Sequence, residues 1–338
     1  MQTLTQYEYL DKDMILRGVV DWLVKESPLL GILPMKSIQG NAYKYNVSTA
    51  LPTASWQSVG DAISESTGTY EQRSTDIYTL IQNAYTDKSA IALNSTQNPE
   101  AIDAQLAAQA MAHEFEKTLI IGQTSVDSST KQFKGLLRLI AEFESSSTTD
   151  LDGQLFSAPD TGHNSQVLSQ AATSGALTQP AMDALIDQVR PGRPDLLLMS
   201  RYARRKLNAL QRAAGSGVEL TESALFGKFM QSYDGIPIYV SDWVKDNYQN
   251  NSSNVLAIAS YDFDTTRATD YDNTTIFAMK LGENGVQGLH AGEMKHERED
   301  IVEDYNAILN RYVWYVGLCC TAKYSLAALI SFDPSASS

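Results

Sequence analysis

The sequence is poor in cysteine, which excludes a fold held together by a disulfide framework. Only two cysteines occur in 338 residues, and they are adjacent, at Cys319 and Cys320. Neighbouring residues of an extended chain point to opposite faces, so these two thiols are badly placed to bond to each other. A chain without disulfides fits a reducing compartment.

Long hydrophobic runs and a secretory leader are also missing. No apolar stretch approaches the roughly 20 residues that a membrane-spanning helix needs. The segment Met1–Leu10 is polar and acidic, and it lacks the basic and apolar pattern of a signal peptide. We therefore expect an unexported, soluble protein without a membrane partner.

Positive charge is scarce relative to negative charge. The chain has 26 Lys and Arg residues against 40 Asp and Glu, which gives a formal net charge of −14. Sequence-specific binding of nucleic acid needs clustered basic charge, so the composition disfavours this class of function. Enclosing nucleic acid without reading its sequence is still compatible with it.

Catalytic and metal-binding motifs are absent. His113-Glu114 begins like the helix motif of zinc proteases, but Lys117 occupies the position of the second histidine. The four histidines and two adjacent cysteines have no metal-ligand spacing. Gly227-Lys228 lacks the rest of a phosphate-binding loop, and no nucleophile elbow occurs. We predict no catalytic residue, no metal site and no cofactor, and therefore not an enzyme.

A long helix is the clearest element that the sequence does contain. Asn98 can cap its start, Pro99 suits the first helical position, and Gly122 suits the residue after its end. Alanines and apolar residues at helical spacing fill the interval. The pattern predicts a helix over 98–122 that is roughly 35 Å long.

The segment 40–90 predicts a long arm. Tyr43, Tyr45 and Val47 alternate with polar residues, and a second alternating run at Ile77–Ile81 predicts a second strand. The polar stretch between them has few residues that can build a core, and loops of this length are usually functional. A two-stranded arm is marginal alone in water, so we expect it to lie on a neighbouring subunit. The alternative is a flexible surface insertion.

The remaining segments predict a mixed architecture. An amphipathic helix at Asp11–Glu26 suggests an arm that packs outside its own core, or else a helix folded back on its own domain. The residues from Ser145 to Ser174 read as loop. An antiparallel strand pair, Gly285–Val302 with Asn306–Lys323, is expected to lie against the long helix. Between them, helices and strands alternate over about 170–285, which favours a mixed α/β domain: helices at 178–189 and 201–213, and strands at 195–199, 235–240 and 256–260.

The order of these parts resembles the major capsid proteins of tailed double-stranded DNA phages, whose fold is shared with encapsulins. The resemblance covers nearly the whole chain and is carried by Ala110–Gly122, Phe133–Leu137, Asp195–Tyr202, Tyr233–Trp243 and Gly285–Tyr324. It implies an α+β capsid fold. Its expected parts are an N-terminal arm at 1–38, an extended β-hairpin loop with flanking strands at 39–92, a peripheral domain at 93–170 with the spine helix at 98–122, a mixed α/β axial domain at 171–284, closing strands of the peripheral domain at 285–330 and a tail at 331–338.

The same resemblance implies a structural function. The chain would assemble with itself into hexamers and pentamers of an icosahedral shell that encloses double-stranded DNA without sequence specificity. It would be assembled in the host cytoplasm and located in the virion, with a portal, a separate scaffolding protein and a decoration protein as further partners. The alternatives are an encapsulin-type nanocompartment around cargo enzymes and a soluble α/β enzyme.

Five residues are candidate inter-subunit contacts, because they are large or charged and lie on segments with little core to join. They are Trp56, Tyr70, Arg73, Glu297 and Arg298. An exposed, inert role is the alternative for each. Some members of the resembled family join a loop lysine covalently to a neighbour's asparagine. No lysine lies between Lys44 and Lys88 here, so we predict a shell without such cross-links.

Overall fold

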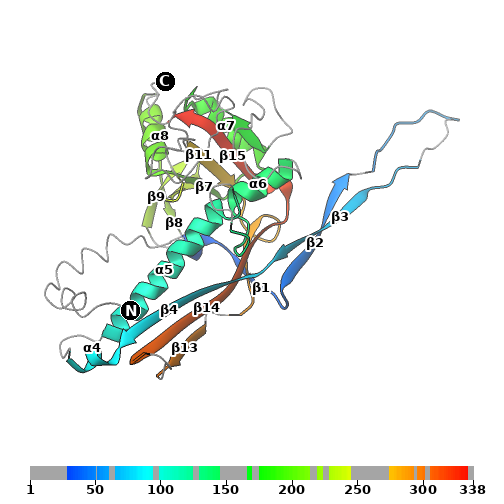
Figure 1. Ribbon diagram of the computed structural model, residues 1–338. Coiled ribbons are helices and arrows are strands. Elements are labelled where there is room, and N and C mark those ends of the chain that lie inside the picture. The colour runs from blue at the N-terminus through cyan, green and yellow to red at the C-terminus, as the bar shows by residue number, and fades with distance from the viewer. Residues whose placement is uncertain are drawn as a thin grey trace, which may run out of the picture.

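The structure is a computed structural model, and not every residue of the chain is described. The described residues are 29–50, 52–60, 65–93, 99–124, 129–144, 166–169, 175–213, 219–223, 228–244, 274–292, 295–300 and 305–333. The expected helix at Asp11–Glu26 and the expected strand at 256–260 lie outside them. Figure 1 shows an elongated body built on a long helix, from which a thin two-stranded ribbon projects.

The long helix is present as predicted, as α5 at Pro99–Ile121. Its buried side includes Phe115, whose ring lies 5.6 Å from that of Phe133 and 5.1 Å from that of Trp314. Gly122 follows the last turn, and a Cβ there would lie 2.4 Å from the carbonyl oxygen of Phe133. Only glycine allows this close crossing, which turns the chain into α6 at Leu136–Glu144.

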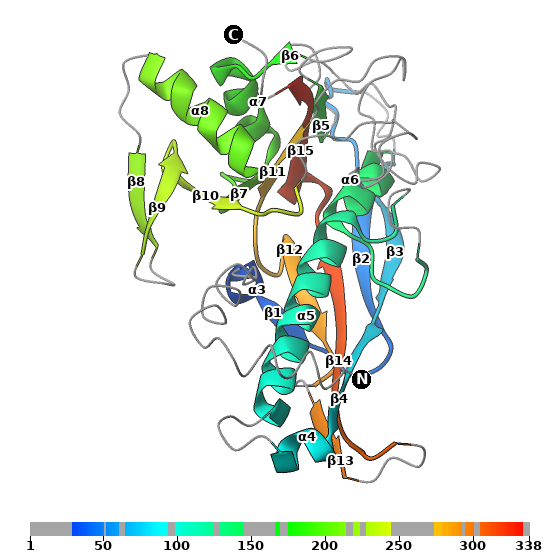
Figure 2. The same cartoon turned by 60° about the vertical axis from the view of Figure 1, so that its left-hand side comes forward.

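A five-stranded sheet lies against α5 (Figure 2). Its strands follow the order β1-β12-β14-β13, and β4 pairs with the other edge of β14. The strands are β1 Met35–Ser37, β4 Tyr78–Asp87, β12 Val286–His290, β13 Lys295–Glu299 and β14 Ala307–Cys320, with the short helix α4 at Lys88–Leu93 after β4. Both β12 and β13 are antiparallel to β14, which confirms the predicted strand pair beside the long helix.

The projecting ribbon corrects one prediction. Its strands are β2 Ala42–Ala50 and β3 Thr69–Asp76. Of the run at 77–81, which was expected as the second strand of the arm, residues 78–81 lie in β4 of the five-stranded sheet. One residue, Ile77, separates β3 from β4, so the chain leaves the sheet almost without interruption. The residues of β3 are mostly exposed and polar, so no alternation marked them as a strand.

A second sheet has eight strands, in the order β5-β15-β11-β7-β10-β9-β8, with β6 beside β15. All four residues of β7 are buried, as the apolar run predicted. The side-chain oxygen of Thr178 caps α7 by accepting from the Ala181 N–H at 3.4 Å. The elements are β5 Val167–Ser169, β6 Gly175–Ala176, β7 Leu196–Met199, β8 Glu219–Ser223, β9 Lys228–Tyr233, β10 Ile236–Val240, β11 Thr274–Met279, β15 Leu326–Asp333, α7 Gln179–Gln188, α8 Arg201–Ala213 and the 3-10 turn η1 Lys323–Ser325.

The strand β15 joins the two halves of the molecule. Ala328 and Ile330 belong to the core that contains α5 and α6, while Ala327 and Leu329 belong to the core under α7 and α8. Within the segment 285–330, which was expected to close the peripheral domain, β15 pairs with β11 in the second sheet. The short β5 likewise lies in a stretch that was expected to be loop.

The start of the described chain is also part of the core. Leu29, in the short helix α3 Leu29–Ile32, is 2% exposed, and Leu33 is 5% exposed. Both pack in the cluster around α5, and β1 follows in parallel with β12. Within the expected arm 1–38, residues 29–37 therefore pack on their own subunit.

Candidate assembly interfaces

The ribbon and its tip expose side chains that elsewhere build cores. Trp56 is 105% and Val59 108% exposed, and Tyr70 on β3 is 77% exposed. Large exposed apolar side chains that gather in one patch are typical of surfaces that other molecules cover. The structure thus places two of the five candidate contacts, Trp56 and Tyr70, on a surface that is free within the subunit.

The base of the ribbon is fixed to the body. The Tyr45 hydroxyl donates to the carbonyl oxygen of Cys320 at 3.2 Å, and burial raises the pKa of that phenol far above its ordinary value. Lys36 donates to the Tyr43 hydroxyl at 3.2 Å and pairs with Glu283 at 3.2 Å. These contacts hold the base of the ribbon in a fixed position on the body of the subunit.

Arg73 is directed along the ribbon. It lies opposite Tyr45 in the pairing of β2 with β3, and its guanidinium contacts Glu71 at 3.5 Å. An exposed pair at this distance contributes little to stability. Arg73 is thus partly engaged inside its own subunit.

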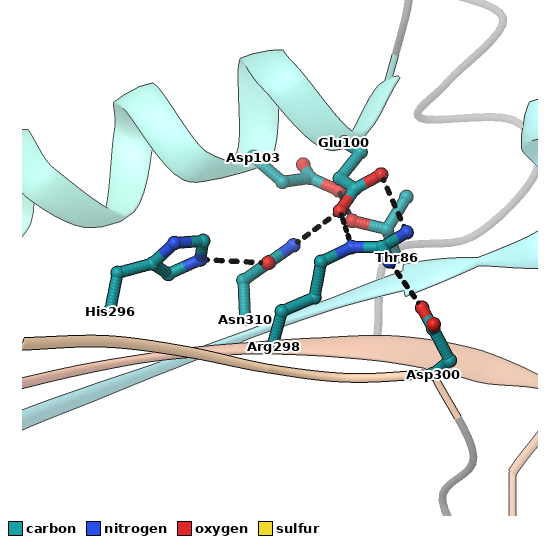
Figure 3. A network of polar contacts seen from close by, with 7 residues as sticks. All are labelled: Thr86, Glu100, Asp103, His296, Arg298, Asp300 and Asn310. Carbon is teal, nitrogen blue, oxygen red and sulfur yellow. Dashed lines mark hydrogen bonds and ion pairs between the residues drawn. The ribbon is translucent and has the colours of Figure 1, made fainter.

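Glu297 and Arg298 are neighbours on β13, but their side chains make different contacts. Glu297 is exposed and faces Arg311 across the pair of β13 with β14. Arg298 instead contacts Glu100 at the start of α5, with 2.6 Å between Nε and Oε1, and also reaches Asp300 (Figure 3). The hydrogen bond from Arg298 holds the pKa of Glu100 below its usual value.

The Glu100 carboxylate also fixes a chain of hydrogen bonds. It accepts from Asn310 Nδ2 at 3.2 Å, and Asn310 Oδ1 lies 2.9 Å from His296 Nε2. A carboxylate only accepts, so the amide nitrogen of Asn310 must face it. The amide oxygen then faces His296, and Nε2 of that ring carries a proton. The His296 ring also stacks on Tyr312, with 4.8 Å between the ring centres.

A second contact completes this network in Figure 3. Thr86 on β4 donates to Asp103 on α5 at 2.7 Å, in a buried position. The first turn of α5 is thereby joined to β4, β13 and β14. Sequence reasoning missed this role of Arg298, because Glu100 is 198 residues away and no local pattern links the two.

Clusters of metal-binding side chains are missing from the part of the chain that the structure describes. There, no group of three or more His, Cys, Asp or Glu side chains is arranged to hold a metal ion. None of the helices within the described ranges is both long and apolar enough to cross a membrane. A cavity of about 160 Å³ lies between α5, the first residues of β4 and the segment 129–133.

Comparison with solved structures shows which proteins have a similar fold. The SrpI encapsulin complex from Synechococcus elongatus is similar with a TM-score of 0.64 at 16% identity, covering 93% of this chain and 90% of that chain. The capsid of a native GTA particle is similar with a TM-score of 0.57 at 14% identity, covering 90% of this chain and 89% of that chain. A structure from Mycobacterium phage Bobi is similar with a TM-score of 0.56 at 15% identity, covering 90% of both chains. The chain therefore has the fold that phage capsid proteins share with encapsulins.

The sequence narrows this class. Residues 11–169, just under half of the chain, match the family model described as "Major capsid protein GP7". No curated protein sequence matches significantly. The family match thus covers less than half of the chain, and the fold is one that a phage-type capsid and an encapsulin have in common.

Proposed function

We propose that this chain is the major capsid protein of a tailed double-stranded DNA phage. It assembles into hexamers and pentamers, and these close into an icosahedral shell around the genome. DNA is enclosed without sequence specificity, in keeping with the net charge of −14. The portion around 171–284 would surround the centre of each hexamer or pentamer, and the five-stranded sheet with α5 would lie at its periphery.

One observation carries this proposal beyond the family match. The ribbon β2–β3 extends away from both cores and ends in Trp56 and Val59, which are fully exposed. A two-stranded ribbon is marginal in water unless something covers it. A neighbouring subunit supplies that cover in a shell, and each subunit then contacts several others, so individually weak contacts add up.

Further partners follow from the same function. A portal, a separate scaffolding protein and a decoration protein are proposed, each as a partner of the assembled shell. The proposed shell is held by non-covalent contacts alone, because residues 45–87 contain no lysine that could form a covalent link from the ribbon.

An encapsulin-type shell is the second candidate. The likeness to the SrpI encapsulin, with its TM-score of 0.64, favours it. The two candidates share a fold and differ in what the shell encloses. The family match over residues 11–169 favours the phage capsid.

The test is the size and content of the purified protein. Size-exclusion chromatography and negative-stain microscopy should show hollow icosahedral particles, or free hexamers and pentamers, after expression alone or with the neighbouring genes. DNA that survives nuclease treatment inside the particles would support the phage capsid, and a co-purified enzyme would support the encapsulin. A monomer or dimer at every concentration and salt, even after co-expression, would refute both shell functions.

A further inference from the structure

Positive charge is concentrated on α8, although the chain as a whole is acidic. The 13 residues from Arg201 to Ala213 hold four arginines and one lysine, and no Asp or Glu. An even spread of the 26 Lys and Arg residues of the chain would place one in a segment of this length. The helix is therefore a basic element in a protein whose net charge is −14.

The arginines form a stripe on the outward side of this helix. Ala203 and Leu207 are buried in the core under α7 and α8. Because a helix turns by about 100° per residue, Arg201, Arg205 and Arg212 all lie on the opposite side, and all three are exposed. This arginine stripe is about 16 Å long. Figure 2 shows α8 at the periphery of the half that contains the second sheet.

Two of the three guanidinium groups are not neutralised by the described residues. Arg201 pairs with Asp242, with 2.7 Å between Nε and Oδ1. Arg205 instead lies over the ring of Tyr202, with 4.7 Å between Cζ and the ring centre. Within the described ranges, neither Arg205 nor Arg212 makes an ion pair with a carboxylate. These two side chains thus present positive charge that is available to a ligand.

The composition of the outward side favours a phosphate backbone over a protein surface. Protein interfaces gather aromatic and other large apolar side chains at their centres. On α8 the exposed residues are only arginine and alanine, with Ala209 and Ala213 beside the stripe. Guanidinium groups match phosphate oxygens in pairs and need no apolar neighbours to do so. The stripe is therefore typical of a surface that binds a polyanion by its charge.

Double-stranded DNA is the polyanion that the proposed shell encloses. An acidic subunit repels DNA at long range, so cations gathered on one helix mark the place where contact costs least. Each DNA strand carries one phosphate per about 3.4 Å of helix axis, so the stripe spans about four or five phosphates.

From this match we propose that the arginine stripe of α8 contacts the phosphate backbone of the enclosed DNA. The contact rests on the proposed shell function and specifies which surface of the subunit faces the genome. Contacts to phosphate carry no sequence information, so any packaged sequence would be held equally well.

A salt titration of DNA binding tests the stripe in solution. The full chain, as free subunits, is mixed with a fluorescent duplex of about 20 base pairs, and anisotropy gives the binding constant at each salt concentration. Removing two phosphate contacts with Arg205→Gln and Arg212→Gln should lower the slope of log K against log salt by about 1.8. Affinity at low salt should fall at least about tenfold. An unchanged slope would overturn the proposal.

The matched control removes the same charge elsewhere. Lys131 and Lys295 are both exposed, on the segment 129–133 and on β13. The double variant Lys131→Gln with Lys295→Gln should leave the slope unchanged, and thermal unfolding shows whether both double variants stay folded. Equal losses in the two double variants would mean that DNA responds to net charge alone, which would also overturn the proposal.

A photo-crosslinking residue identifies what covers the stripe in particles. p-Benzoylphenylalanine in place of the exposed Ala209 should give nucleotide adducts on the peptide containing 209, in filled particles treated with nuclease from outside. Empty particles should give none. Capture of an acidic segment instead would overturn the assignment to DNA, whether it comes from another protein or from α7 of a second copy, where Asp183 and Asp187 are exposed.

The size and content of each sample separate the two proposals. If DNA-filled particles form but residue 209 gives no nucleotide adduct, the contact is wrong and the shell function stands. If no particles form in any condition, both are refuted.

Discussion

Replacing Trp56 by alanine is expected to weaken assembly and to leave the folding of the subunit unchanged. The side chain is 105% exposed, so it contributes no packing within its own chain. In the shell, a neighbour is expected to cover it. The substitution should thus change the strength of assembly without changing the stability of the folded subunit, two quantities that are hard to separate in most oligomeric proteins.

The size of the effect follows from the area involved. A tryptophan buries about 150–250 Å² when fully covered, which at about 25 cal/mol per Å² sets an upper limit near 4–6 kcal/mol per contact. Ordering the exposed tip on binding offsets part of this, so we expect about 2–4 kcal/mol, which raises the concentration needed for assembly roughly 30- to 1,000-fold.

Light scattering over a concentration series measures that threshold, and thermal unfolding of dilute subunits measures folding. Trp56→Phe is the control, since it keeps a large ring and should lose much less. Assembly of Trp56→Ala at the unchanged threshold would refute the role of the tip. A melting temperature that falls in dilute subunits would show instead that Trp56 packs within its own chain.

Three further predictions concern the body and the ribbon. Phe115→Ala should lower the free energy of unfolding by about 3–5 kcal/mol in urea titrations, because this fully buried ring packs on two other aromatic rings; a loss under about 1 kcal/mol would contradict the packing described. Arg298 lowers the pKa of Glu100 below the ordinary 4.5, so the contribution of this carboxylate is complete above that pH and is lost as the pH falls through the folded-state pKa. Accordingly, the gap in melting temperature between wild type and Glu100→Gln should shrink on acidification, and a constant gap would count against the ion pair. Mature particles boiled in SDS should run as single subunits, since no lysine lies between Lys44 and Lys88; a ladder of covalent oligomers would show that another residue forms the link.

The parts of the fold that were predictable share one property, which is that their signals are local. The helix α5 is bounded by Pro99 and Gly122, and α7 starts with Thr178 as cap and Pro180 in its first turn, so local signals placed these helix ends. The apolar run 196–199 was recognisable because a strand that is buried on both faces is apolar throughout and does not alternate with polar residues.

The parts that were missed depend on distant partners. The residues of β3 are polar on both faces, so only their pairing with β2 makes them a strand. Arg298 was expected to contact another subunit because it is charged and lies on a segment with little core to join. Its partner in the structure, Glu100, lies on a distant element of the same chain. The strand β15 was expected only as part of the closing segment 285–330, and that its successive residues enter two different cores depends on tertiary packing.

By itself, the sequence determined the long capped helix and the polar arm, because each follows from residue type and spacing along the chain. The shell function was implied by the resemblance of the order of the parts to phage capsid proteins. Only the tertiary structure decided which strand edges are protected and which are open. That distinction depends on which strand lies at the end of each sheet, and hydrogen bonding between distant segments, not local composition, sets that order.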